Sequence, residues 1–233
     1  MLWSLLVGAF IAIPGPAPAG IPPAAADSIR IGVISGPLGS FASTILEARR
    51  IPFDTVTEKT PSGALNGYDI LIVDNLFRLT DLNGPAFQRY VAKGGVLVVI
   101  NPKPDGFTRA FSPYDIFIGD YVREGKIEDR KHPLFDGFKD DKLQDFADSN
   151  GPYVGNCSFA EPGKQWTVLA KPRKGKNALI VEAGYGKGWM ILTCTRFDFY
   201  NAKPDPTRLG DNLIDYAMAK ARAIHDSAAA KPR

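Results

Sequence analysis

The sequence predicts an α/β domain with a mostly parallel central sheet and helices on both of its faces. Four short apolar segments in the first half alternate with turn-rich or helical stretches, which is the pattern of consecutive βα units. Residues 68–74 and 96–100 are nearly continuous apolar runs, as in strands that are buried on both faces. Because crossovers between parallel strands are right-handed, we expect the intervening helices on both faces of the sheet.

The first half of the domain supplies strands and helices in turn. Ser40 stands where a side chain can cap a helix, and Gly94–Gly95 stands where the next helix would end. The expected strands are 29–34, 53–57, 68–74 and 96–100, and the expected helices are 40–50 and 82–93.

The second half begins less regularly. Residues 101–165 are rich in Pro, Gly, Asp and Phe and show little periodicity, which predicts long surface loops. Apolar runs then predict three further strands, and Gly184–Gly188 joins the last two as a hairpin. The expected elements are strands at 166–170, 178–182 and 189–193 and a closing helix at 207–223, with a disordered tail at 226–233.

The N-terminus has the composition of an export signal. Residues 1–13 form an apolar run as long as a signal-peptide core, and the Pro/Ala-rich segment 14–26 ends on small residues suited to cleavage. We therefore expect a leader over 1–26 and a single domain over 27–225, exported to the periplasm or the extracellular space. The mature chain is expected to have no membrane span.

Two alternatives to a cleaved signal stay open. No Lys or Arg precedes Arg30, so the usual positive flank is missing, and the leader could be an uncleaved anchor or follow a misassigned start codon. N-terminal sequencing of the secreted protein distinguishes these, since an intact Met1 would contradict cleavage.

Charge and composition disfavour several classes of function. The 28 Lys and Arg residues nearly balance the 25 Asp and Glu residues, and they are scattered, so no nucleic-acid groove is predicted. Neither of the two histidines has a second His or Cys at ligand spacing, so we expect no metal site and no cofactor. An acidic segment could hold calcium, but it lacks the EF-hand order and includes lysines, which favours a solvated loop (Asp136, Asp140, Asp141, Asp145, Asp148).

Ligands of open α/β sheets bind at the carboxyl ends of the strands. Here that rule selects segments 35–39, 74–78, 101–106 and 195–198. Segment 35–39 precedes a helix and could present backbone N–H groups to an anion, but it has no phosphate-binding glycine motif and no lysine. A turn followed by an N-cap at Ser40 is the favoured interpretation.

The two cysteines have three interpretations. Cys157 lies in a segment that matches a nucleophile elbow poorly, because Phe159 replaces its last glycine. Cys157 and Cys194 could form a disulfide in an oxidising compartment, and otherwise both would be small buried hydrophobic residues. A count of free thiols in the denatured protein separates these cases.

Together, four segments resemble the class I glutamine amidotransferase-like superfamily, particularly its trehalose-utilisation (ThuA-like) branch and the middle domain of some β-galactosidases. They are YDILIVDN at 68–75, FQRYVAKGGVLVVI at 87–100, HPLFDGF at 132–138 and YGKGWMILTCTRFD at 185–198. The resemblance implies a flavodoxin-like three-layer sandwich, with strands added by the late hairpin.

The sequence departs from these families where they carry their reactive groups. The resemblance implies a cysteine elbow after strand 96–100, but the chain continues as Asn101–Pro104, and the downstream His-x-Glu pair is absent. ThuA-like proteins commonly have a histidine at that elbow and another before the position of Asp198, where this chain has Phe197. His132 matches the family, and we expect it to hold its loop by packing and by hydrogen bonds to the backbone.

Our first hypothesis is an exported, non-catalytic domain that binds a small molecule, such as a carbohydrate, or a partner protein at the carboxyl edge of the sheet. A second is a carbohydrate-active enzyme that uses a carboxylate pair such as Asp74 and Asp198. A third is a structural module of an envelope assembly, with the aromatic segment 106–121 as its contact surface. The candidate ligand-binding residues are Asn101, Lys103, Asp105, Arg196, Asp198 and Asp74.

Overall fold

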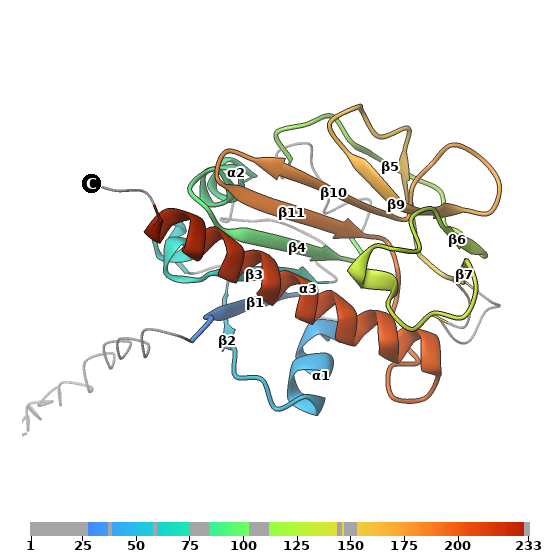
Figure 1. Cartoon of the computed structure of the whole chain (residues 1–233), viewed down its shortest axis with the longest axis horizontal. Helices are drawn as coiled ribbons and strands as arrows, with labels where there is room; N and C mark the ends of the chain where they lie inside the picture. The colour runs from blue at the N-terminus through green and yellow to red at the C-terminus, as the bar shows by residue number, and fades with distance from the viewer. Residues whose placement is uncertain are drawn as a thin grey trace, which may run out of the picture.

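The fold is a large sheet with helices packed on both sides (Figure 1). A computed structural model describes residues 28–36, 39–57, 60–74, 84–102, 112–143, 146 and 153–230. The leader at 1–26, the candidate residues Lys103 and Asp105 and residues 106–111 of the aromatic segment 106–121 lie outside these ranges.

Nine of the described strands form one sheet in the order β2-β1-β3-β4-β11-β10-β9-β6-β7, and β5 pairs with β8 beside it. The strands are β1 (Ile31–Ser35), β2 (Asp54–Thr55), β3 (Ile70–Asp74), β4 (Val96–Ile100), β5 (Phe117–Gly119), β6 (Gly125–Ile127), β7 (Lys142–Leu143), β8 (Ser158–Ala160), β9 (Thr167–Pro172), β10 (Ile180–Tyr185) and β11 (Gly188–Thr193).

The sheet is mixed, which corrects the prediction of a mostly parallel one. Strands β2, β1, β3, β4 and β11 pair in parallel, whereas β10, β9, β6 and β7 continue the sheet in antiparallel pairs. The cause lies in β11, which follows β10 through a tight turn and then pairs in parallel with β4. The late hairpin therefore joins two halves of the sheet, and it does not merely extend one edge.

The described α-helices that flank the sheet are α1 (Phe41–Ala48), α2 (Gly84–Ala92) and α3 (Pro204–Ala229). Helices α1 and α3 pack against each other and against β3, while α2 packs with β4, β11 and the short 3₁₀ helix η1 (Ser62–Gly67). Helix α3 continues to Ala229, beyond its expected end at 223 and into the tail expected to be disordered. Residues 226–229 belong to the helix because its alanines favour helical backbone.

Two further expectations need correction. Segment 101–165 is not only loop, since it supplies β5, β6, β7, β8 and the 3₁₀ helix η3 (Pro133–Phe135). These strands have two or three residues each, too short to show an alternating pattern. The hairpin turn is also tighter than Gly184–Gly188, because Tyr185 pairs with Gly188 and Gly186 adopts a positive φ of 60° between them.

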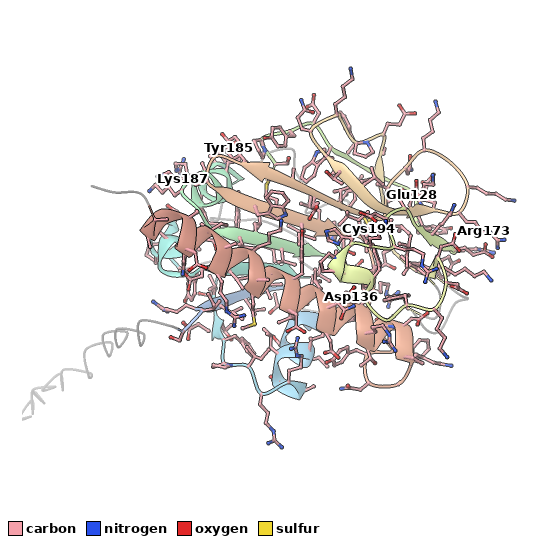
Figure 2. The ribbon with its side chains drawn as sticks, in the orientation of Figure 1. Glu128, Asp136, Arg173, Tyr185, Lys187 and Cys194 are labelled. Atoms are coloured by element: carbon pink, nitrogen blue, oxygen red, sulfur yellow. The ribbon has the colours of Figure 1, made fainter. Side chains whose placement is uncertain are left out.

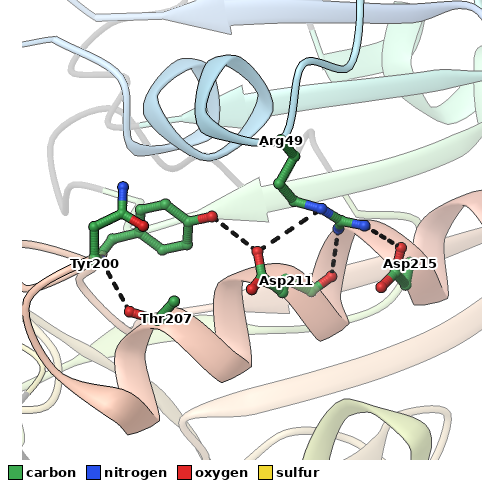
Figure 3. A network of polar contacts seen from close by, with 6 residues as sticks. Arg49, Tyr200, Thr207, Asp211 and Asp215 are labelled. Carbon is green, nitrogen blue, oxygen red and sulfur yellow. Dashed lines mark hydrogen bonds and ion pairs between the residues drawn. The ribbon is translucent and has the colours of Figure 1, made fainter.

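A polar network joins α1 to α3 (Figure 3). The guanidinium of Arg49 donates to the Asp211 carbonyl at 2.9 Å and to Asp215 Oδ1 at 2.6 Å. The Tyr200 hydroxyl donates to Asp211 Oδ1 at 2.8 Å. Burial, together with the neighbouring Asp211 carboxylate, raises the pKa of Tyr200 to about 12, so this hydroxyl remains a donor at neutral pH.

Within the described part of the chain, no helix combines the length and the apolar character needed to cross a membrane.

Candidate ligand-binding site

The carboxyl ends of four parallel strands meet on one edge of the sheet. Asp74 of β3 lies in register with Ser35 on one side and with Ile100 on the other, and Ile100 lies in register with Thr193 of β11. Neighbouring strands are about 4.8 Å apart, so the residues that follow these ends are close to one another. Strands β2 and β3 also lie on opposite sides of β1, which is the arrangement that opens a crevice at this edge.

Asp74 contacts the first turn of α1. The residue is fully buried, and its Oδ2 atom accepts hydrogen bonds from Ser40 Oγ at 3.0 Å and from the Ala42 backbone N–H at 2.7 Å. Ser40 also caps the helix, since its hydroxyl accepts from the Ser43 N–H at 2.9 Å, which confirms the N-cap interpretation. The positive end of this helix dipole thus already has an internal carboxylate, which disfavours a second anion there.

Asn101 directly follows β4 and has a left-handed backbone conformation. Its φ is 46°, an angle that few side chains tolerate and that asparagine tolerates better than most. The residue is 1% exposed, and its backbone N–H donates to the Thr193 carbonyl at 2.7 Å. The chain therefore turns sharply after β4, and the residue at the turn carries a buried amide.

The two cysteines lie together behind this turn. Cys157 Sγ is 3.0 Å from Cys194 Sγ and 3.2 Å from the Pro102 carbonyl, and both thiols are free and fully buried. Figure 2 places Cys194 just beyond the end of β11. Burial and the neighbouring Cys157 raise the pKa of the Cys194 thiol well above its usual range, so the reactive thiolate is disfavoured there.

Arg196, Asp198 and Asn156 form the more accessible polar group at this edge. The Arg196 guanidinium lies 2.5 Å from Asp198 Oδ2 and donates to Asn156 Oδ1 at 3.1 Å. The side chains of Arg196 and Asp198 are 27% and 18% exposed. A bridge between Gly155 and Thr195 holds the two segments side by side. The structure thus brings Asp74, Asn101, Arg196 and Asp198 to one edge, with Asp74 and Asn101 buried.

His132 lies away from this edge, against the middle of β10. Its Nδ1 accepts the Leu134 backbone N–H at 3.3 Å, so the neutral ring carries its proton on Nε2, which lies 3.4 Å from Glu182 Oε1. Glu182 Oε2 also accepts from Trp189 Nε1 at 3.1 Å and from the Tyr216 hydroxyl at 2.9 Å. Both nitrogens of His132 therefore face protein groups.

Sequence reasoning missed this buried cluster around Glu182. A signal for it exists in the run ALIVE at 178–182, because a carboxylate inside an apolar strand requires buried partners. Burial raises the pKa of Glu182, but the contacts with His132, Tyr216 and Trp189 outweigh it and hold the pKa below its usual value.

Folding stability should accordingly decline in acid partly through Glu182. Because the pKa is lowered in the folded state, the stabilisation is complete above the ordinary value of 4.5 and is lost as pH falls through the folded value. We expect Glu182→Gln to flatten the dependence of unfolding free energy on pH below about pH 5, measured by urea titration. The exposed Glu124→Gln serves as control, and an unchanged pH slope in Glu182→Gln would contradict this origin.

The second histidine lies at the opposite end of the sheet. His225 Nε2 is 2.9 Å from Asp69 Oδ1, directly before the first residue of β3. No three His, Cys, Asp or Glu side chains come together as a metal site in the ranges the structure describes, which exclude Asp145 and Asp148 of the acidic segment.

No protein-family model matches this sequence, and no curated protein matches it. Solved structures, however, resemble it across most of its length. A putative ThuA-like protein from Bacteroides uniformis aligns with a TM-score of 0.55 at 14% identity, over 85% of this chain and 95% of its own. A putative GMP synthase component from Thermoplasma acidophilum gives 0.58 at 12% identity, over 85% and 98%. The chain shares their fold.

The same fold also occurs inside a larger enzyme. A β-galactosidase from Rahnella sp. R3 aligns with a TM-score of 0.56 at 15% identity, over 84% of this chain but only 32% of its own. At these identities the likeness concerns the fold alone, and the site has to be interpreted from its own residues.

Proposed function

We propose that this chain is an exported, non-catalytic domain of the amidotransferase-like, flavodoxin-like type that binds a ligand at the carboxyl edge of its sheet. The observation that carries the proposal is the turn after β4, which keeps the left-handed backbone of an elbow but holds Asn101, buried beside Thr193. An amide is neither a nucleophile nor a general base at neutral pH.

The surrounding groups support binding rather than acid–base chemistry. His132 is engaged by Leu134 and Glu182, and His225 lies at the other end of the sheet. Asp74 is buried against α1, so it offers no open carboxylate to pair with Asp198 in a glycosidase-like cleft.

Arg196, Asp198 and Asn156 would contact the ligand. Together they provide guanidinium donors, a carboxylate and an amide, a set that suits a polar ligand with both donors and acceptors. Lys103 and Asp105 follow Asn101 closely in the chain and would add one charge of each sign.

A thermal-shift screen with sugars, amino acids and metal ions tests this proposal. A ligand at 100 times its Kd should stabilise the protein by about 2.7 kcal/mol, which raises Tm by about 5–10 °C for a domain of this size. We expect at least one ligand whose shift Arg196→Gln abolishes and Lys142→Gln, which breaks an exposed ion pair elsewhere, leaves unchanged. Silence across the panel, or an equal shift in Arg196→Gln for every ligand that binds, would count against binding at this edge.

A further inference from the structure

A separate cavity of about 470 Å³ lies at the antiparallel end of the molecule. It is lined by residues 120–124 after β5, by Ser158 of β8 and by residues 172–175 and Asn177 around the end of β9, and it shares no residue with the candidate site above. Figure 2 shows one of its lining residues, Arg173, at the end of the molecule beyond Cys194. Its volume falls within the range of about 300–1,000 Å³ that is usual for small-molecule sites.

A hydroxyl and an amide lie together in the cavity wall. Asn177 Nδ2 donates to Ser158 Oγ at 2.8 Å, and Ser158 is 1% exposed. Gly119 lies opposite Ser158 in the β5–β8 pair, and a Cβ there would be 2.8 Å from Asn177 Nδ2 and 2.9 Å from Ser158 Oγ. The glycine thus leaves space for a pair that can both donate and accept hydrogen bonds.

One exposed aromatic ring lines the cavity, and a second lies on the neighbouring strand β5. Tyr121 is 63% exposed and Phe117 is 46% exposed, and among the described residues these are the exposed large hydrophobic side chains. Tyr121 lines the cavity, where its ring is held edge-on to the Tyr153 ring at 5.3 Å. Phe117 lies two residues before Gly119 on β5 and therefore on the same face of that strand.

The charges around the cavity nearly cancel. Arg173 is paired with Glu124 at 3.1 Å, and the Arg123 guanidinium stacks over Tyr153 at 5.5 Å from the ring centre. Asp120 and Lys174 add one charge of each sign to the rim. No single sign dominates, so the lining favours an uncharged ligand over a phosphate or a cation.

From this geometry we propose that the cavity binds a neutral carbohydrate. The apolar C–H face of a sugar ring packs on Tyr121, and its hydroxyls exchange hydrogen bonds with the Asn177 amide, which Ser158 holds in place, and with the rim charges. A sugar ring has both an apolar face and a surrounding set of donors and acceptors, which is what this wall offers. The proposal stands independently of ligand binding at the carboxyl edge.

Isothermal titration calorimetry of the full chain with maltohexaose, cellohexaose, mannohexaose and chitohexaose tests this site. We expect at least one of them to bind, Tyr121→Ala to weaken binding about tenfold, and Tyr121→Phe to retain it within about threefold. Arg196→Gln should leave this affinity unchanged, which separates the cavity from the carboxyl edge. Because Tyr121 is exposed, its variants should remain folded, as unchanged unfolding midpoints would verify.

Three results would overturn the carbohydrate site. These are no heat from any of the four oligosaccharides, binding that Tyr121→Ala does not weaken, and binding that is lost in Arg196→Gln but kept in Tyr121→Ala. Capture of extended peptides from a random library in place of the sugars would show a protein-docking surface and would equally contradict the proposal.

Discussion

Replacement of Glu182 by alanine is expected to lower the unfolding free energy by about 3–5 kcal/mol. The Glu182 side chain is 9% exposed and accepts from Trp189 and Tyr216 while it faces His132 Nε2 at 3.4 Å. Without the carboxylate, the Trp189 and Tyr216 donors lose their acceptor and His132 loses the neighbouring carboxylate, and each unsatisfied buried group costs about 1–3 kcal/mol. The cluster also joins β10, α3 and the loop before η3, so its loss should lower the stability of the whole domain and not of one element alone.

Urea unfolding monitored by circular dichroism measures this effect. Tyr216→Phe is the matched control, because it removes one donor to Glu182 and keeps the ring that packs on His132 at 4.6 Å. We expect it to cost about 1–2 kcal/mol, clearly less than Glu182→Ala. A loss below about 1 kcal/mol in Glu182→Ala would show that water replaces the carboxylate and that the cluster stabilises little.

Oxidation of Cys157 and Cys194 to a disulfide is expected to stabilise the protein by about 3–4 kcal/mol. The thiols are 3.0 Å apart and 37 residues apart in the chain, so the bond would close a loop of substantial entropy in the unfolded state. Two thiols lose two protons and two electrons in this step, and oxidised glutathione accepts the electrons in thiol–disulfide exchange.

Refolding in oxidised glutathione, followed by thiol counting in denaturant, tests this bond. We expect no free thiols in the oxidised sample, two in the reduced sample, and a higher urea midpoint only for the oxidised one. Cys157→Ser should remove the difference between the two samples. Two free thiols after oxidative refolding would instead support the interpretation as buried hydrophobic residues.

The central strands of the parallel half of the sheet could be predicted because their sequences are short, nearly unbroken apolar runs. Residues 96–100 form β4 as expected, since a strand buried on both faces needs an unbroken apolar run. The direction of β11 could not be predicted, because its sequence does not say whether it pairs with β4 or lies outside β10. That choice makes the sheet mixed, and it depends on contacts between distant segments.

The candidate site was predictable in place but not in detail. The rule for strand ends placed Asp74, Asn101, Arg196 and Asp198 at one edge of the sheet, where the structure has them, and that a ligand binds there stays a prediction. The sequence could not show that Asp74 would accept the Ala42 N–H across 32 residues and so be buried. The adjacency of the cysteines was likewise hidden, because the bridge between Gly155 and Thr195 produces it.

The position of β11 also governs when the domain can fold during synthesis. Strand β4, with which β11 pairs, is complete about 90 residues earlier in the chain. Arg49, which follows α1, donates to Asp215, a residue 166 positions later. Until β11 has been synthesised, β4 therefore has one unpaired edge, and all of its residues are apolar. The nascent chain needs protection from association through this edge over that interval.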